Sequence, residues 1–254
     1  MKLDLLFDPF GATWKQVREG ALAAEGEGFD GVWLYDHLAG SVHGAPRVLE
    51  CWTILSALAA SVPRIALGPM VLNVANRDPG TLAVMAATLQ ELSAGRLLLG
   101  LGAGGGRDTP YAAEQEALGR RVAGDAARRG QLEEAVATLR AVWSGRVGGV
   151  GGFLRPEPKP PVILGGFGPK LAELAGRVAD GVNLPAGARL EQLLALARRA
   201  HAEAGRDPAS FLVTASSDFS PPALERLGML GVHRAVAFVA PPYVQRLRRL
   251  AVAH

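Results

Sequence analysis

The chain has 254 residues, of which 49% are hydrophobic, and it carries a formal net charge of +3 at pH 7. This composition excludes an intrinsically disordered chain and is sufficient for one large core. The basic residues are scattered and no apolar stretch reaches the roughly 18–20 residues that span a bilayer, so neither a nucleic acid nor a membrane is expected as a partner.

Apolar runs of strand length alternate with stretches of helical period along the whole chain. The expected strands cover residues 3–7, 31–35, 64–72, 95–102, 160–166, 180–185, 210–216 and 233–240. The expected helices cover residues 14–27, 49–62, 79–93, 111–118, 120–143, 168–179, 189–205, 221–231 and 241–254. Pro79 is well placed in a first helical turn, and Gly205 is well placed as a left-handed helix cap.

Eight strands that alternate with helices predict an α/β fold, a (β/α)8 TIM barrel that residues 1–254 form as a single domain. Each strand is an apolar run, which is expected where both faces of a parallel sheet are covered. The alternative is an open doubly wound sheet, which usually has fewer strands.

Residues 144–161 interrupt this alternation, with glycines in their first half and prolines in their second. Such a density of backbone breakers excludes regular secondary structure. A linker between two domains is one interpretation, but neither flank would form a complete barrel alone. We therefore expect a mobile loop over the mouth of the barrel.

The stretch GRLLLGLGAGGG, residues 95–106, ends an apolar strand in a run of glycines. Gly100, Gly102 and Gly105 match the spacing of a dinucleotide-binding turn, but no helix opens directly after them, and the Lys and Ser/Thr pair of a P-loop is missing. At the end of a barrel strand, such glycines would let a flat ring or a phosphate approach the backbone. A turn that makes room for packing explains them equally well.

A second glycine stretch, ILGGFGPK, ends the fifth expected strand and leads into a helix. Backbone amides at the start of a helix form an anion site, and Lys170 adds a positive charge there. Two glycine loops at two strand ends fit a long ligand with a flat end and an anionic end. The second strand leads into Tyr35, Asp36 and His37, which places polar groups at the same mouth.

Several stretches, in this order, are similar to the bacterial luciferase-like superfamily, which comprises flavin-dependent monooxygenases and relatives that use the deazaflavin coenzyme F420. They are GFDGVWLYDH, LECWTILSALAASVPRIALG, ATLQELSAGRLLLGLGAGG, VWSG, PPVILGGFGPK and VADGVN. The resemblance covers most of the chain. It implies a (β/α)8 barrel that binds FMN or F420 at the carboxyl ends of its strands.

The resemblance also implies which residues meet the cofactor. Residues 70–73 would form a bulge under the redox-active ring, with a non-proline cis peptide between Met70 and Val71. Residues 103–104 would flank the ring, and residues 165–168 would hold the phosphate end. The expected cofactor-binding residues are Asp36, His37, Met70, Val71, Asn73, Ala103, Gly104, Gly165, Gly166, Phe167 and Gly168.

The expected catalytic residue is His37, because an imidazole can donate or accept a proton near neutral pH, and Asp36 is expected to orient it. The chain departs from the family after the fourth strand. Some F420-dependent members carry a glutamate there, whereas this chain has Gly105 and Gly106. Either Glu50, at the start of a helix near the mouth, replaces this acid, or proton transfer from that position is lost.

Other types of site are not supported by the sequence. No histidine, cysteine or carboxylate spacing predicts a metal site, and no G-x-S-x-G nucleophile elbow occurs. Cys51 is expected to be a small buried residue, and His43 is expected on the surface. A single cysteine excludes an internal disulfide and fits the cytoplasm, and the N-terminal apolar run is too short and too often broken by acids for a signal peptide.

The main functional hypothesis is an oxidoreductase that transfers a hydride between coenzyme F420 and a small organic substrate, and the resemblance implies a homodimer. The first alternative is an FMN-dependent monooxygenase that uses reduced flavin and O2. The second is a non-catalytic barrel that retains a ligand pocket. A metal-dependent or aldolase-type barrel is the third, but it lacks an evident cluster of carboxylates and histidines.

Overall fold

The strands of the computed structural model, which describes residues 1–251, form one parallel sheet of nine strands. Their order in the sheet is β3, β2, β1, β9, β8, β7, β6, β5, β4. The strands are β1 (Lys2–Phe7), β2 (Gly31–Leu34), β3 (Ala66–Pro69), β4 (Leu72–Asn73), β5 (Leu99–Gly102), β6 (Val162–Gly165), β7 (Gly181–Leu184), β8 (Leu212–Ser216) and β9 (Arg234–Val239).

The sheet closes into a barrel because β3 and β4 are two pieces of one predicted strand. Met70 and Val71 separate the pieces, and the peptide bond between them is cis, as the family resemblance implies. β3 pairs with β2, and β4 pairs with β5. A bridge between Leu67 and Leu97 completes the closure, and the Leu98 amide donates to the Leu67 carbonyl at 2.8 Å. The predicted (β/α)8 barrel is therefore confirmed.

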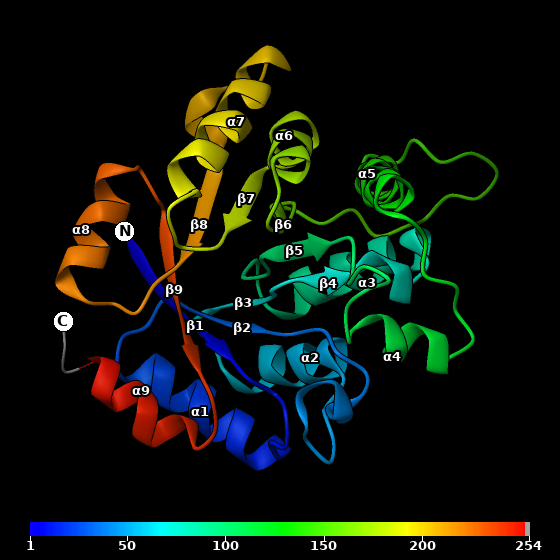
Figure 1. Cartoon of the computed structure of the whole chain (residues 1–254). Coiled ribbons are helices and arrows are strands. Elements are labelled where there is room, and N and C mark those ends of the chain that lie inside the picture. The colour runs from blue at the N-terminus through cyan, green and yellow to red at the C-terminus, as the bar shows by residue number, and fades with distance from the viewer. Residues whose placement is uncertain (252–254) are drawn as a thin grey trace.

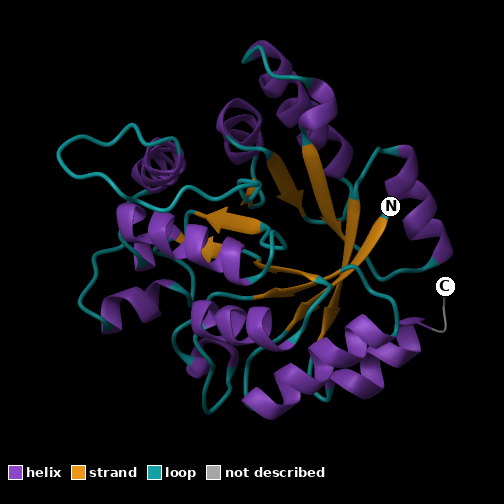
Figure 2. Cartoon of the chain, turned by 180° about the vertical axis from the view of Figure 1, so that it is seen from behind, coloured by secondary structure: helices purple, strands orange, loops and turns teal. Residues whose placement is uncertain are grey.

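The helices form an outer ring around the strands (Figures 1 and 2). None within residues 1–251 is both long enough and apolar enough to cross a bilayer. The last predicted helix extends to His254, but residues 252–254 lie outside the described part. The helices are α1 (Trp14–Gly26), α2 (Cys51–Ser61), α3 (Pro79–Leu92), α4 (Ala112–Ala117), α5 (Asp125–Trp143), α6 (Pro169–Val178), α7 (Leu190–Glu203), α8 (Pro221–Met229) and α9 (Tyr243–Ala251).

Local sequence signals explain where several helices begin and end. Thr13 and Gln16 form a capping box before α1, so that two backbone amides without helical partners are satisfied reciprocally. The Asp78 carboxylate accepts from the Thr81 amide at 2.8 Å, and Pro79 occupies the first turn of α3 as predicted. Gly205 follows α7 with a φ of 69°, which confirms the predicted left-handed cap.

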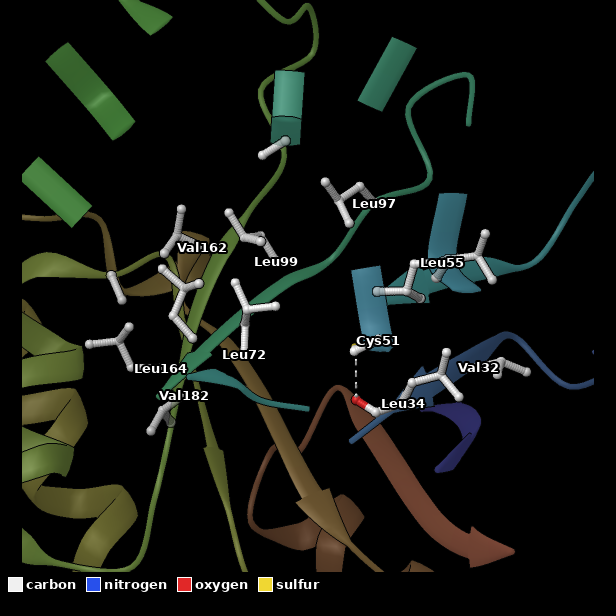
Figure 3. Packing of buried hydrophobic residues seen from close by; sticks show 14 of the residues in the cluster. Val32, Leu34, Cys51, Leu55, Leu72, Leu97, Leu99, Val162, Leu164 and Val182 are labelled. Atoms are coloured by element: carbon white, nitrogen blue, oxygen red, sulfur yellow. Dashed lines mark hydrogen bonds between the residues drawn. The ribbon is translucent and has the colours of Figure 1, made fainter. Parts of the chain in front are cut away.

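Alternate residues of β1, β2, β6 and β9 contribute to two separate hydrophobic cores. The larger core lies between the strands and the helices, and Figure 3 shows part of it around β4, β5 and β6. Cys51 lies there as predicted, buried and 3.8 Å from the Leu34 carbonyl. The second core consists of inward side chains of the barrel and is made of Leu6, Trp33, Met70, Ile163 and Val236. The interior is therefore filled below the carboxyl ends of the strands.

Residues 144–161 contain neither helix nor strand, as predicted, but their position differs from the prediction. They connect the end of α5 to the start of β6 and project beside α5 as a long loop (Figure 1). The Pro158 carbonyl accepts from the Gln90 side chain at 2.8 Å, and the Pro161 carbonyl accepts from the Leu99 amide at 3.0 Å. Both contacts lie at the amino ends of the strands, so the expectation that this loop covers the mouth is wrong.

Candidate cofactor and active site

The carboxyl ends of the strands surround a cavity of about 760 Å³. Both glycine stretches contribute to its wall, as does the segment that follows β2. A volume of this size is typical of small-molecule and cofactor sites. All eleven residues that the sequence predicts for cofactor binding line this one cavity: Asp36, His37, Met70, Val71, Asn73, Ala103, Gly104, Gly165, Gly166, Phe167 and Gly168.

His37 is paired with a buried acid that the sequence analysis did not identify. Its Nδ1 lies 2.6 Å from Glu114 Oε1, and the other carboxylate oxygen accepts from the Leu38 amide and, at 3.2 Å, from the Ala39 amide. Three donors thus hold the Glu114 side chain, which is 6% exposed. His37 Nε2 makes no hydrogen bond with any described residue, so the imidazole has one fixed nitrogen and one free nitrogen.

Asp36 and Glu50 do not hold His37, which contradicts the roles predicted for them. The Asp36 carboxylate accepts from both Nη atoms of Arg77, at 2.8 and 3.0 Å, and from the Asn73 amide at 2.8 Å. Glu50 also accepts from Arg77 and caps the first amides of α2, and it does not line the cavity. Asp36 therefore fixes the chain just beyond the cis peptide, and Glu114 takes the place predicted for Glu50.

Aromatic rings surround the His37 imidazole within the cavity. The ring centroids of Tyr111 and Phe10 lie 5.0 and 5.2 Å from that of His37, and Tyr35 lies 6.1 Å away. His43 is exposed as predicted, yet it also lines the cavity, and its ring lies 4.4 Å from Phe10. This wall is apolar apart from the two imidazoles and the Tyr hydroxyls, so it suits a planar organic group.

Close packing against a neighbouring side chain explains why the ends of β5 and β6 are glycines. A Cβ at Gly102 would lie 2.3 Å from Val71 Cγ2, and one at Gly165 would lie 2.5 Å from Val71 Cγ1. These glycines therefore leave room for the Val71 side chain at the bulge. Gly104 is different, because its φ of 73° favours glycine whatever the neighbouring space. Of the two explanations left open by the sequence, room for packing thus applies at Gly102, and the approach of a flat ring or a phosphate stays a prediction.

Replacing Gly165 by alanine is expected to lower the free energy of unfolding by about 1–3 kcal/mol, because the new methyl group overpacks against the stiff Val71 side chain. Urea denaturation measures the change. Gly151→Ala is the control, because that glycine lies in the 144–161 loop with no atom within 4 Å of its Cβ position. A Gly165→Ala protein as stable as this control would contradict the packing explanation.

The part of the cavity around residues 165–168 is suited to an anion. Gly168 precedes α6, no side chain caps that helix, and Pro169 occupies its first turn. The amides at the start of α6 and the helix dipole favour negative charge there. Arg128 also lines this cavity, and its buried Nε makes no hydrogen bond with any described residue. The residues therefore fit a group that has a planar ring and an anionic chain.

Glu114 is expected to make the stability of the fold depend on acid pH. Burial favours its protonated form, but the hydrogen bonds from His37, Leu38 and Ala39 and the charge of His37 outweigh burial and lower the pKa of Glu114 below its ordinary 4.5. The carboxylate thus stabilises the fold above that pH, and this contribution is lost as the pH falls through the lower folded value.

Between pH ~6 and pH ~3.5, we expect the wild-type chain to lose about 1–2 kcal/mol more stability than Glu114→Gln, the scale of hydrogen bonds to a charged group. Urea denaturation across this range provides the measurement. Glu116→Gln, which changes an exposed glutamate of the same helix, should follow the wild type. Equal acid sensitivity in Glu114→Gln and the wild type would exclude this role.

No group of three or more His, Cys, Asp or Glu side chains in residues 1–251 is arranged to hold a metal ion. The functional residue that sequence reasoning missed is Glu114. The sequence shows only that a short helix after the glycine run contains glutamates. Glu114 and Glu116 both meet that description, so the sequence does not distinguish between them. Only the packing of α4 against the segment after β2 shows that Glu114 contacts His37.

Two known proteins of similar sequence are named as a dehydrogenase and a reductase. The chain is 33% identical over 177 residues to an F420-dependent glucose-6-phosphate dehydrogenase of Microbacterium testaceum (strain StLB037), covering 65% of this chain and 51% of the relative. It is 32% identical over 220 residues to a 5,10-methylenetetrahydromethanopterin reductase of Methanolobus tindarius, covering 81% of this chain and 61% of the relative. The chain thus spans about half the length of the first of these relatives.

The fold is shared with solved structures of lower identity. A coenzyme F420-dependent tetrahydromethanopterin reductase from Methanopyrus kandleri superposes with a TM-score of 0.76 at 16% identity, covering 98% of this chain and 97% of that one. The model of the luciferase-like monooxygenase family matches residues 6–221. That match covers most of the barrel and includes His37, Glu114 and both glycine stretches. The chain belongs to the luciferase-like monooxygenase family.

Proposed function

We propose that this protein is an oxidoreductase that binds coenzyme F420 and transfers a hydride between it and a small organic substrate. The observation that carries the proposal is the pairing of His37 with buried Glu114, 2.6 Å apart, in the cavity that the Met70–Val71 bulge also lines. The name of one relative supports F420 rather than FMN, because the glucose-6-phosphate dehydrogenase of Microbacterium testaceum is named F420-dependent.

The residues that would hold the cofactor are those predicted from the sequence. Met70 and Val71 would support one face of the ring, and Ala103 with Gly104 would flank it. The loop of residues 165–168 at the start of α6 would take the phosphate. When bound, the deazaflavin supplies a carbon atom that accepts or returns a hydride. The protein contributes orientation, electrostatics and the exclusion of water.

The proton that accompanies the hydride is assigned to His37 Nε2. With Nδ1–H donated to the Glu114 carboxylate, Nε2 carries a lone pair that faces no other hydrogen-bond partner in the described structure. When Nε2 takes up a proton, Glu114 stabilises the resulting positive charge at 2.6 Å. His37 is therefore the catalytic residue, and Glu114 is the residue that positions it and stabilises its protonated form.

A second cavity, of about 640 Å³, adjoins the first at the ends of β7, β8 and β9. Leu184, Leu227 and Val236 make it largely apolar, and Arg226 and Ser216 add polar groups. It is assigned to the substrate because it adjoins the bulge that would support the ring. The residues that line both cavities are Tyr35, Met70, Val71, Gly165, Gly166, Phe167 and Phe238.

Titration of the purified protein with F420 and, separately, with FMN tests the proposal. We expect saturable quenching of deazaflavin fluorescence and much weaker binding of FMN. Absorbance of F420 then reports its reduction by a panel of alcohols and sugar phosphates, or the oxidation of its reduced form by ketones. Saturable binding of FMN alone would reject the proposal.

The second candidate is an FMN-dependent monooxygenase that uses reduced flavin and O2. The family model itself favours it, because the matched family is described by monooxygenase activity. Oxygen consumption with reduced FMN would identify it. A non-catalytic barrel was suggested by the missing acid after the fourth strand, and Glu114 removes that argument. The cytoplasmic location and the homodimer stay predictions, which fractionation and light scattering would test.

A further inference from the structure

Three cations line the cavity where α5 and α6 begin, and we call Arg128, Arg129 and Lys170 the cationic shelf. Arg128 fixes the shelf to the loop after β5. Its Nη1 donates to the Ala103 carbonyl at 3.3 Å and to the Gly104 carbonyl, and its Nη2 donates to Asp125 at 2.8 Å. The shelf is therefore attached to the same loop that would flank the cofactor ring.

The other two cations of the shelf are free to bind a ligand. Neither Arg129 nor Lys170 makes an ion pair or a side-chain hydrogen bond with any residue between 1 and 251. Asp125, at the start of α5, is the acid that pairs with Arg128 of the shelf. The hydrogen bond and charge of Arg128, followed by the charges of Arg129 and Lys170, lower the pKa of that carboxyl. Arg128 thus has an acidic partner, whereas Arg129 and Lys170 have none among the described residues.

The backbone adds to this positive field. Both α5 and α6 begin after a glycine, Gly124 or Gly168, and no side chain caps either helix. Uncapped amides and two helix dipoles therefore point toward the same region as the free cations.

We propose that Arg129 and Lys170 bind the carboxylate groups that follow the phosphate in the tail of F420, so that this chain selects an acidic-tailed deazaflavin over FMN. The inference rests on the proposed function and adds the basis of cofactor selection. FMN ends at its phosphate, which residues 165–168 would hold. F420 continues beyond its phosphate into a chain of carboxylates, and the shelf lies next to those residues, with Lys170 only two positions after Gly168.

The test compares three ligands: F420 with its oligoglutamate tail, a truncated deazaflavin that ends at its phosphate, and FMN. Dissociation constants come from fluorescence quenching at ~20 mM and ~300 mM salt, since screening weakens exposed charge pairs. The variants are Arg129→Gln, Lys170→Gln and the double variant. Arg121→Gln is the matched control, because Arg121 is exposed and lies outside the cavity lining.

At low salt, each single variant is expected to weaken F420 binding about threefold to fivefold, and the double variant about tenfold or more, as exposed ion pairs allow. Binding of the truncated deazaflavin should change less than about twofold, and high salt should reduce the difference. An unchanged affinity for F420, or an equal loss for the truncated ligand, would overturn the inference. Binding of FMN without either deazaflavin would instead overturn the proposed function.

Discussion

Replacing His37 by glutamine is expected to reduce turnover with F420 by about 10²–10⁴-fold, the range that a positioned general acid or base contributes. The side chain remains polar but cannot take up a proton, so the loss falls on kcat. The dissociation constant of F420 should change less than about threefold, since the residues that would hold the ring contribute mainly backbone and apolar groups. Stopped-flow absorbance of F420 measures the first quantity, and fluorescence quenching measures the second.

Two further variants separate catalysis by His37 from a structural role. Glu114→Gln keeps a hydrogen-bond partner for His37 but removes the negative charge, so we expect a smaller loss of about tenfold to a hundredfold and an altered pH profile. Glu116→Gln, exposed on the same helix, serves as the control. His37→Gly with added imidazole should recover part of the lost rate. A His37→Gln protein that turns over at the wild-type rate would eliminate the assigned mechanism.

Replacing Asp4 by alanine is expected to lower the free energy of unfolding by about 3–5 kcal/mol, the cost of leaving a buried charge without its partner. Asp4 accepts from Arg234 Nε at 2.5 Å and from Nη2 at 2.6 Å, and it also accepts from the Trp33 indole at 2.8 Å. The side chains of Asp4 and Arg234 are 0% and 6% exposed. The substitution therefore leaves three buried donor atoms, two on Arg234 and one on Trp33, unsatisfied inside the barrel.

Urea denaturation with and without the substitution measures this loss. Glu133→Ala is the matched control, because it removes the acid from an exposed pair: Glu133 lies 3.5 Å from Arg177, and the two side chains are 45% and 53% exposed. That change should cost less than about 1 kcal/mol. Equal losses in the two variants would show that the Asp4 network contributes no more than a surface ion pair.

The barrel could be predicted from the sequence because each strand is buried on both faces and therefore consists mostly of consecutive apolar residues. The break in the third strand is the exception. A hydrophobic run from residue 64 to residue 72 predicts one strand, whereas the structure has β3 and β4 on either side of Met70 and Val71. The family resemblance, rather than the pattern of the residues, placed a bulge and a cis peptide there.

The candidate site was predicted in part. The eleven expected cofactor-binding residues meet in one cavity, because parallel strands bring their carboxyl ends to the same edge of a barrel. The partners of the polar residues were predicted wrongly. Asp36 neighbours His37 in the chain but contacts Arg77, and Glu50 contacts Arg77 as well. Adjacent residues after a strand end point in different directions, so adjacency does not predict pairing.

The amino-acid sequence by itself determined the barrel, most helix boundaries and the edge that carries the candidate site, since these depend on periodicity and on short-range capping. The start of α5 is an exception, because that helix begins at Asp125 rather than at residue 120. Only the tertiary structure decided that Glu114 pairs with His37 across 77 positions. It likewise decided that residues 144–161 lie at the amino ends of the strands. Contacts between distant segments depend on how α4 and α5 pack on the barrel, and no local pattern of residues records that packing.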